Sequence, residues 1–225
     1  MNSMQDGQRS ISFLLYRVFA WMAVGVGVSG ITAIFVAQNP LLLYRYSFVL
    51  PLLLIGQLVL VMLLSWRIAT LSYSAAKLMF IVYAVMSGAT LSVIFQQYTT
   101  ASIAQVFFIA ASMFATMAIY GAYTKTNLAQ WRNLLFMTLF GLVIALGVNI
   151  FLQSSRLDFI AAIVGVLLFS ALTAFDIQNI QRLATSLLAR EEDWNKIALL
   201  GALQLYLDFI NLFLSLLRLF GRRQD

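Results

Sequence analysis

Seven apolar segments, each close to the length of a membrane span, dominate this sequence. They lie at about residues 18–37, 48–66, 78–97, 102–123, 134–152, 158–178 and 197–217. A helix needs roughly 20 apolar residues to cross the hydrocarbon core of a bilayer. The chain is 62% hydrophobic and 10% charged, whereas soluble domains are roughly 45–50% apolar and 25% charged. A soluble fold of 225 residues could not bury so much apolar surface. We therefore predict an all-α integral membrane protein with seven transmembrane helices.

The segments follow one another without a linker or low-complexity tract, so we expect a single membrane domain over residues 1–225. Residues 1–12 would form a short cytoplasmic tail. The first segment is too long for a signal-peptide core and is expected to be retained. The short tail and compact loops favour a bacterial cytoplasmic membrane.

Basic residues concentrate on alternate loops, which places the N-terminus in the cytoplasm by the positive-inside rule. The inside charges are Arg9, Arg17, Arg67, Lys77, Lys125, Arg132, Arg182, Arg190 and Lys196. The opposite loops carry only Arg45 and Arg156. The C-terminal tail, with Arg218, Arg222 and Arg223, breaks this pattern, so either a basic tail lies outside or one segment is re-entrant. The net charge of +6 is explained by residues flanking spans, and we expect no nucleic-acid partner.

The sequence contains no cysteine and no histidine. Disulfides, thiolate chemistry and the commonest metal ligand are therefore excluded, together with the usual proton switch near neutral pH. Proton chemistry would depend on the eight Asp and Glu residues. Only Asp176 and Asp208 lie inside apolar segments, and Asp158 is expected to cap the sixth helix. A charge at membrane depth costs a few kcal/mol on insertion scales, and such residues usually face the bundle interior and mark ion or proton paths.

The last segment carries one polar stripe on an otherwise lipid-like helix. Its members follow steps of three and four residues, which keeps them on one face: Gly201, Gln204, Asp208, Asn211 and Ser215. A shorter stripe on the sixth segment comprises Thr173, Asp176 and Asn179. Antiparallel packing of these two helices would bring Asp176 and Asp208 together in the cytoplasmic half of the membrane. The alternative is that the polar side chains only hydrogen-bond neighbouring helices.

Arg67 ends the second segment on the same side, beside the interfacial Trp66. Its guanidinium could form a bidentate ion pair with Asp176. Alternatively, Arg67 only extends to the headgroup layer and sets the topology.

Several motifs together resemble one membrane family. They are FSALTAFDIQ (residues 169–178), YLDFINLFLSLLR (206–218), SGATLSVIF (87–95), YGAYTKTNL (120–128) and the first helix, YRVFAWMAVGVGVSGITAIFVA (16–37). The chain is similar over nearly its whole length to the Bax inhibitor-1 family, also called the transmembrane Bax-inhibitor-motif family. Asn127 is a departure, because an aspartate is common there; we interpret it as loop drift.

The resemblance implies six helices around a central seventh, and an activity as a calcium-leak channel or as a regulator of calcium and cell death. In pH-sensitive members two aspartates form a sensor coupled to an arginine on the second helix, and by motif these are Asp176, Asp208 and Arg67. We expect a calcium leak gated by protonation of this pair, with Thr173, Asn179, Gln204 and Asn211 as a supporting polar pathway. The two aspartates would hold calcium only in transit, since Ca²⁺ takes six to eight oxygen ligands. No resident cofactor is expected.

Two other functions remain open. The chain could regulate another membrane protein or a protease without transporting ions itself. An intramembrane aspartyl protease also needs paired aspartates, but that class has Gly-x-Gly-Asp at its second aspartate, whereas Leu205, Tyr206 and Leu207 precede Asp208 here. We therefore expect no enzymatic activity.

Overall fold

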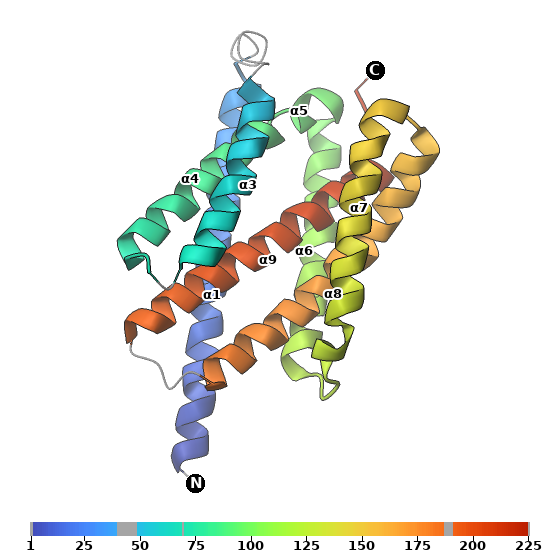
Figure 1. Ribbon diagram of the computed structural model, residues 1–225. Coiled ribbons are helices and arrows are strands. Elements are labelled where there is room, and N and C mark those ends of the chain that lie inside the picture. The colour runs from blue at the N-terminus through green and yellow to red at the C-terminus, as the bar shows by residue number, and fades with distance from the viewer. Residues whose placement is uncertain (1, 40–48, 69, 187–190, 225) are drawn as a thin grey trace. The chain divides into compact units, whose positions relative to one another are not determined.

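The computed structural model describes residues 2–39, 49–68, 70–186 and 191–224. Arg45 and Arg190, which support the predicted orientation, lie outside the described residues, as does residue 48 at the start of the second predicted segment. The helices are α1 (Asn2–Ala37), α3 (Val49–Arg67), α4 (Tyr73–Leu91), α5 (Ile94–Gln97), α6 (Thr100–Tyr123), the 3-10 helix η1 (Leu128–Trp131), α7 (Arg132–Leu152), α8 (Ser155–Ser186) and α9 (Glu191–Phe220). Figure 1 shows this all-helical architecture.

Seven of the described stretches are helical, long enough and apolar enough to cross a membrane, which confirms the predicted fold class. They are Ile11–Ala37, Val49–Arg67, Tyr73–Gln97, Thr100–Tyr123, Leu128–Leu152, Ser155–Ala184 and Trp194–Phe220. Most of them extend beyond the predicted segments because polar residues at their ends are also helical. The last span is the most buried, with 67% of its apolar window inside the protein. Its central position among six helices stays a prediction.

By their contacts, the described residues form two compact units. The first unit comprises Met1–Gln97, Leu183–Tyr206 and Gln224, and the second comprises Tyr98–Arg182 and Leu207–Arg223. The single-domain organisation of residues 1–225 stays a prediction.

In the first unit, α4 packs against both α1 and α3 (Figure 1). Gly88 allows α4 to approach α1, because a Cβ at this position would come within 2.5 Å of the Ser29 carbonyl oxygen. The buried Ser29 hydroxyl lies 2.7 Å from the Tyr206 hydroxyl and 2.8 Å from the Ala84 carbonyl oxygen. Phe80 packs edge-on against Tyr206. Small residues and one hydroxyl cluster therefore join α1, α4 and the first half of α9.

In the second unit, α6 packs against the second half of α9 through aromatic rings. Phe107 contacts both Phe209 and Phe213, and Phe114 contacts Phe209. The C-terminal segment is fixed to the start of α6, since the Arg222 backbone N–H donates to the Ser102 hydroxyl. These contacts hold the lower-numbered end of α6 against the end of α9.

A tight turn joins α7 to α8, and the two helices run side by side beyond it (Figure 1). Gln153 ends α7 in the left-handed region with φ of 47°. The Asn149 side chain then accepts a hydrogen bond from the Ser154 backbone N–H at 2.9 Å. The prediction that Asp158 caps the sixth helix is wrong. The Ser154 hydroxyl accepts from the Leu157 N–H, and Asp158 lies in the first turn, where it faces Arg218.

Candidate functional site

Asp176 lies on α8 where this helix makes a close backbone approach to α6. A Cβ at Gly121 of α6 would come within 2.7 Å of the Ala174 Cα, two residues before Asp176. Only glycine leaves room for such an approach, and small residues are typical of interfaces between membrane helices. The half-buried Asp176 is therefore held at a fixed position relative to α6.

The structure brings Asp176 and Asp208 together within the second unit. Their carboxyl groups lie within hydrogen-bonding distance of each other. Asp208 is only 5% exposed, and its Oδ2 atom accepts no hydrogen bond from a donor group among the described residues. The geometric prediction that the two aspartates face each other is confirmed, whereas their role stays a prediction. If both groups were carboxylates, neither could donate to the other; one shared proton would supply the missing donor.

Three other polar side chains of the predicted stripes donate hydrogen bonds to backbone carbonyl oxygens of their own helix. The Thr173 hydroxyl donates to the Phe169 carbonyl oxygen at 2.7 Å, and the Asn211 amide donates to the Leu207 carbonyl oxygen at 2.8 Å. Ser215 donates to the Asn211 carbonyl oxygen in the same way. The Oδ1 atom of Asn211 and the second lone pair of Thr173 are not used in these bonds. The stripe is therefore compatible with helix packing and still offers acceptor oxygens.

The remaining predicted site residues are Asn179, Gln204 and Arg67. Asn179 is exposed on α8, and Gln204 is half-buried in the first unit. Arg67 is the exposed last residue of α3, also in the first unit, and its carbonyl oxygen accepts from the Leu71 N–H. The pairing of Arg67 with Asp176 stays a prediction, as does a polar pathway through Asn179 and Gln204.

Ser170 is a polar residue that the sequence reasoning missed. Its hydroxyl is buried without a hydrogen-bond partner among the described residues. It lies three residues before Thr173 on α8, and this spacing places both on the same helix face. Gly165 of the same helix contacts Ser215, and Asp176 contacts Asp208, so α8 and α9 run antiparallel with Ser170 between these two levels. The i+3 spacing was a usable signal, but the predicted stripe began only at Thr173.

Gln178 is the second residue that was missed. Its amide N–H₂ donates to the Thr126 carbonyl oxygen and its carbonyl oxygen accepts from the Leu128 N–H, both at 2.9 Å. Arg182 donates to the Asn127 side chain at 2.6 Å. The loop between α6 and η1 is thereby fixed to α8 immediately after Asp176.

The hydrogen bonds of Asn127 show how an amide side chain fits this loop. Its Oδ1 atom accepts from the Ala129 N–H at 3.1 Å, which caps η1, and it also accepts from Arg182. An aspartate could accept the same two bonds, so the substitution keeps the geometry and removes one negative charge. The interpretation of Asn127 as loop drift stays a prediction.

The described residues thus hold two facing carboxylates inside two membrane spans, and no third acidic side chain joins them into a metal-binding cluster. Such a pair can exchange a proton or give two oxygen ligands to a passing cation. The fold and this pair define a multi-pass membrane protein with an ionisable pair between two of its helices.

The chain belongs to the Bax inhibitor-1 family. The family model described as "Inhibitor of apoptosis-promoting Bax1" matches residues 12–225. The inner membrane protein YbhL of Escherichia coli K12 is 39% identical over 227 residues, covering 99% of this chain and 97% of YbhL. An uncharacterized protein of Borreliella burgdorferi is 38% identical over 94% of this chain and 92% of its own length. A third relative, from Rickettsia prowazekii, is 34% identical over 98% of this chain and 92% of its own length. The resemblance inferred from the motifs is therefore confirmed.

Proposed function

We propose that the protein is a calcium-leak channel of the bacterial inner membrane, gated by protonation of Asp176 and Asp208. The observation that carries this proposal is the approach of these two carboxyl groups inside two membrane spans. Membrane-buried acids usually mark ion or proton paths. Similarity to an inner membrane protein supports the localisation, and the N-terminus is proposed to face the cytoplasm.

The gate follows from the electrostatics of the pair. Two neighbouring carboxylates in a low-dielectric site repel each other, so the pair holds one proton over a range of pH and titrates as a unit. When Asp176 is ionised, its pairing with Arg67 would tie α3 to α8 and close the cytoplasmic mouth. Protonation of Asp176 removes this attraction. The leak should therefore increase as the pH falls.

Calcium would be carried rather than stored. Asp176, Asp208 and nearby oxygen atoms such as Oδ1 of Asn211 provide fewer ligands than the six to eight that Ca²⁺ takes. Water molecules would complete the coordination, and weak binding lets the ion leave again. Protons and Ca²⁺ should compete for the same oxygens.

The test is Ca²⁺ flux against pH with purified protein in liposomes. We expect Asp208→Asn to reduce the flux and to flatten its pH dependence, because the pair can no longer exchange its proton. Asp6→Asn is the matched control: it removes one carboxylate outside the predicted membrane spans and should behave like the unsubstituted protein. An Asp208→Asn protein with unchanged flux and pH profile would remove the pair from the mechanism.

The same assay separates the alternative functions. Absence of flux from correctly folded, unsubstituted protein would favour a regulator that acts on a partner protein. Cleavage of a transmembrane peptide that depends on both Asp176 and Asp208 would favour the aspartyl protease.

A further inference from the structure

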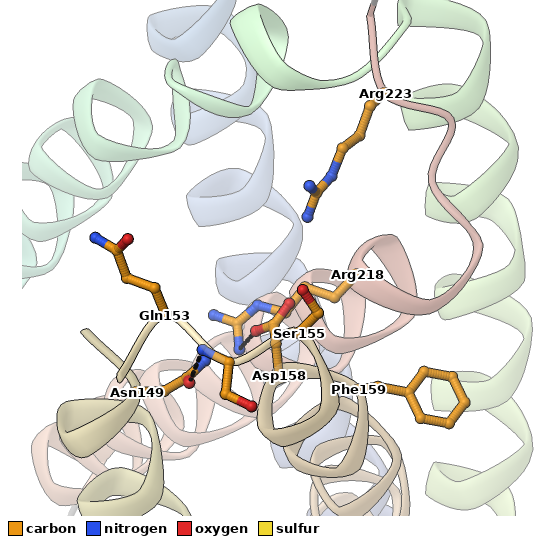
Figure 2. Close-up of a pocket in the computed structure, with 8 residues that line it drawn as sticks. Asn149, Gln153, Ser155, Asp158, Phe159, Arg218 and Arg223 are labelled. Atoms are coloured by element: carbon orange, nitrogen blue, oxygen red, sulfur yellow. Dashed lines mark hydrogen bonds and ion pairs between the residues drawn. The ribbon is translucent and has the colours of Figure 1, made fainter. Parts of the chain in front are cut away.

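A polar pocket of about 400 Å³ opens at the junction of α7, α8 and the end of α9, within the second unit. Figure 2 shows the side chains around it. Its lining residues are Asn149, Gln153, Ser154, Ser155, Asp158, Phe159, Arg218 and Arg223. None of them belongs to the aspartate pair. The pocket lies where the membrane span Ser155–Ala184 begins and where Trp194–Phe220 ends, which is the level of lipid headgroups.

The pocket carries one more positive than negative charge. Arg218 lies 3.9 Å from Asp158, at the outer limit of an ion pair, and both side chains are about one-third exposed. Arg223 extends from the C-terminal segment toward the same pocket (Figure 2). No acidic side chain among the described residues pairs with Arg223. One guanidinium is therefore weakly neutralised by Asp158, and the other is available to an anion.

Neutral donors accompany the two guanidinium groups. Gln153 and Ser155 are exposed, and their side chains make no hydrogen bond to the other described residues. An amide and a hydroxyl suit the hydroxyl and ester oxygens of a headgroup. The planar, fork-shaped guanidinium matches phosphate geometry and can donate two parallel hydrogen bonds.

An apolar strip leads from the pocket along α8 toward the middle of the membrane. Phe159 lines the pocket and is 58% exposed, and Ile163 and Leu167, at successive steps of four, are 40% and 67% exposed. Residues at this spacing share one helix face. A free anion would make no contact with this apolar strip, whereas an acyl chain continuing from a bound phosphate would pack against it.

We propose that this pocket binds the phosphate of an anionic phospholipid, with Arg218 and Arg223 as its ligands and an acyl chain against Phe159, Ile163 and Leu167. Basic pockets between membrane helices on the cytoplasmic side bind anionic headgroups, and the same charge complementarity applies to a pocket at either membrane surface. The net positive charge disfavours a headgroup that carries its own ammonium group. The site would anchor the α7–α8 turn and the end of α9 to one leaflet.

The experiment measures lipid binding to purified full-length protein in a neutral detergent by native mass spectrometry, supported by thermal unfolding. Phosphatidylglycerol should bind and raise the unfolding temperature, whereas phosphatidylcholine of the same chain length should bind at least about tenfold more weakly. Arg223→Gln should weaken phosphatidylglycerol binding about tenfold, the loss of one charge-assisted contact. Arg222→Gln is the matched control, because Arg222 does not line the pocket, and it should leave the affinity unchanged.

Further measurements distinguish binding of the whole lipid from binding of its phosphate group alone. Glycerol phosphate and inorganic phosphate, without acyl chains, should compete only at far higher concentration, and Phe159→Ala should weaken lipid binding. Strong competition by either free anion would overturn the lipid assignment, and so would equal binding of the two lipids. An unchanged affinity of Arg223→Gln, in a protein with unchanged helix content, would also overturn the proposal. These readouts do not depend on ion flux, so their failure is distinguishable from failure of the channel proposal.

Discussion

Gly121 of α6 lies directly against the backbone of Ala174 of α8, one helical half-turn before Asp176. The contact is backbone to backbone, so no side-chain rearrangement can relieve an added atom. Helix α8 carries Asp176 and Gln178 just after this point. The position of the aspartate therefore depends on the absence of a side chain from a residue more than fifty positions earlier in the sequence.

Gly121→Ala is expected to destabilise the protein markedly. Its Cβ would lie 2.7 Å from the Ala174 Cα, and overpacking of a close interface costs about 1–3 kcal/mol. Gly141→Ala is the matched control, because a Cβ there meets nothing within 4 Å; it should be neutral or stabilising by up to about 1 kcal/mol through helix propensity. The measurement is the midpoint of thermal unfolding in detergent, with circular dichroism as the signal. Equal midpoints for the two variants would contradict the proposed close approach.

Gln178→Ala should loosen the loop after α6 without unfolding α8. The substitution removes two hydrogen bonds, to Thr126 and Leu128, and leaves backbone groups unpaired, for which we expect a loss of about 1–3 kcal/mol. Amide hydrogen exchange of Leu128 should become faster. Asn179→Ala, at the exposed neighbouring position, serves as the control and should leave this exchange unchanged. Slow exchange of Leu128 in both variants would show that other contacts hold the loop.

Tyr206→Phe tests the hydroxyl cluster of the first unit. The substitution keeps the ring contacts with Phe80 and Tyr83 and removes the hydrogen bond to Ser29. A net loss of about 0.5–1.5 kcal/mol in the free energy of unfolding is expected. Tyr123→Phe, on a ring that is 82% exposed, should have almost no effect. The effect of Tyr206→Phe should be smaller in a Ser29→Ala background, and full additivity of the two substitutions would contradict a direct bond.

The seven spans were predictable because a bilayer requires a similar length of every crossing helix. The length and hydropathy of each apolar run are therefore enough to identify it as a transmembrane helix. The facing of Asp176 and Asp208 was predictable for a related reason: each stands alone among apolar residues, and the steps of three and four define the face on which it lies. The helix ends were less predictable. Polar residues such as Ser155 and Ser186 continue α8 beyond its apolar part, where hydropathy gives no signal.

The capping prediction failed because the sequence offers several suitable side chains in a row. Ser154 and Asp158 can both accept from the first backbone N–H groups of a helix. In the fold Ser154 accepts from the Leu157 N–H, whereas Asp158 lies inside the first turn and faces Arg218, sixty residues away in sequence. Gln178 was missed for the same reason: its partners, Thr126 and Leu128, are fixed only by the close approach of α6 to α8. Contacts across the fold decide both cases, and a single sequence does not encode them as a local pattern.

The proposed pairing of Arg67 with Asp176 predicts a specific dependence of the calcium leak on pH. On this proposal the pair would hold the mouth closed at a pH where Asp176 is ionised, and acidification would open it by removing the negative charge. Arg67→Gln should therefore leak at high pH, where the unsubstituted protein is closed, and its flux should change little as the pH falls. At low pH, where the pair is already broken, the two proteins should leak to a similar extent.

A double-substitution cycle checks that the two side chains act on each other. Asp176→Asn should also leak at high pH, and adding Arg67→Gln to it should produce no further increase, because the second substitution removes a partner that is already unpaired. Lys77→Gln is the control: it removes a positive charge near the start of α4, where the ammonium group lies over the Tyr73 ring, and the flux profile should stay that of the unsubstituted protein. Flux against pH in liposomes, measured for all five proteins, decides the matter. Independent, additive effects of the two substitutions would show that Arg67 does not act through Asp176.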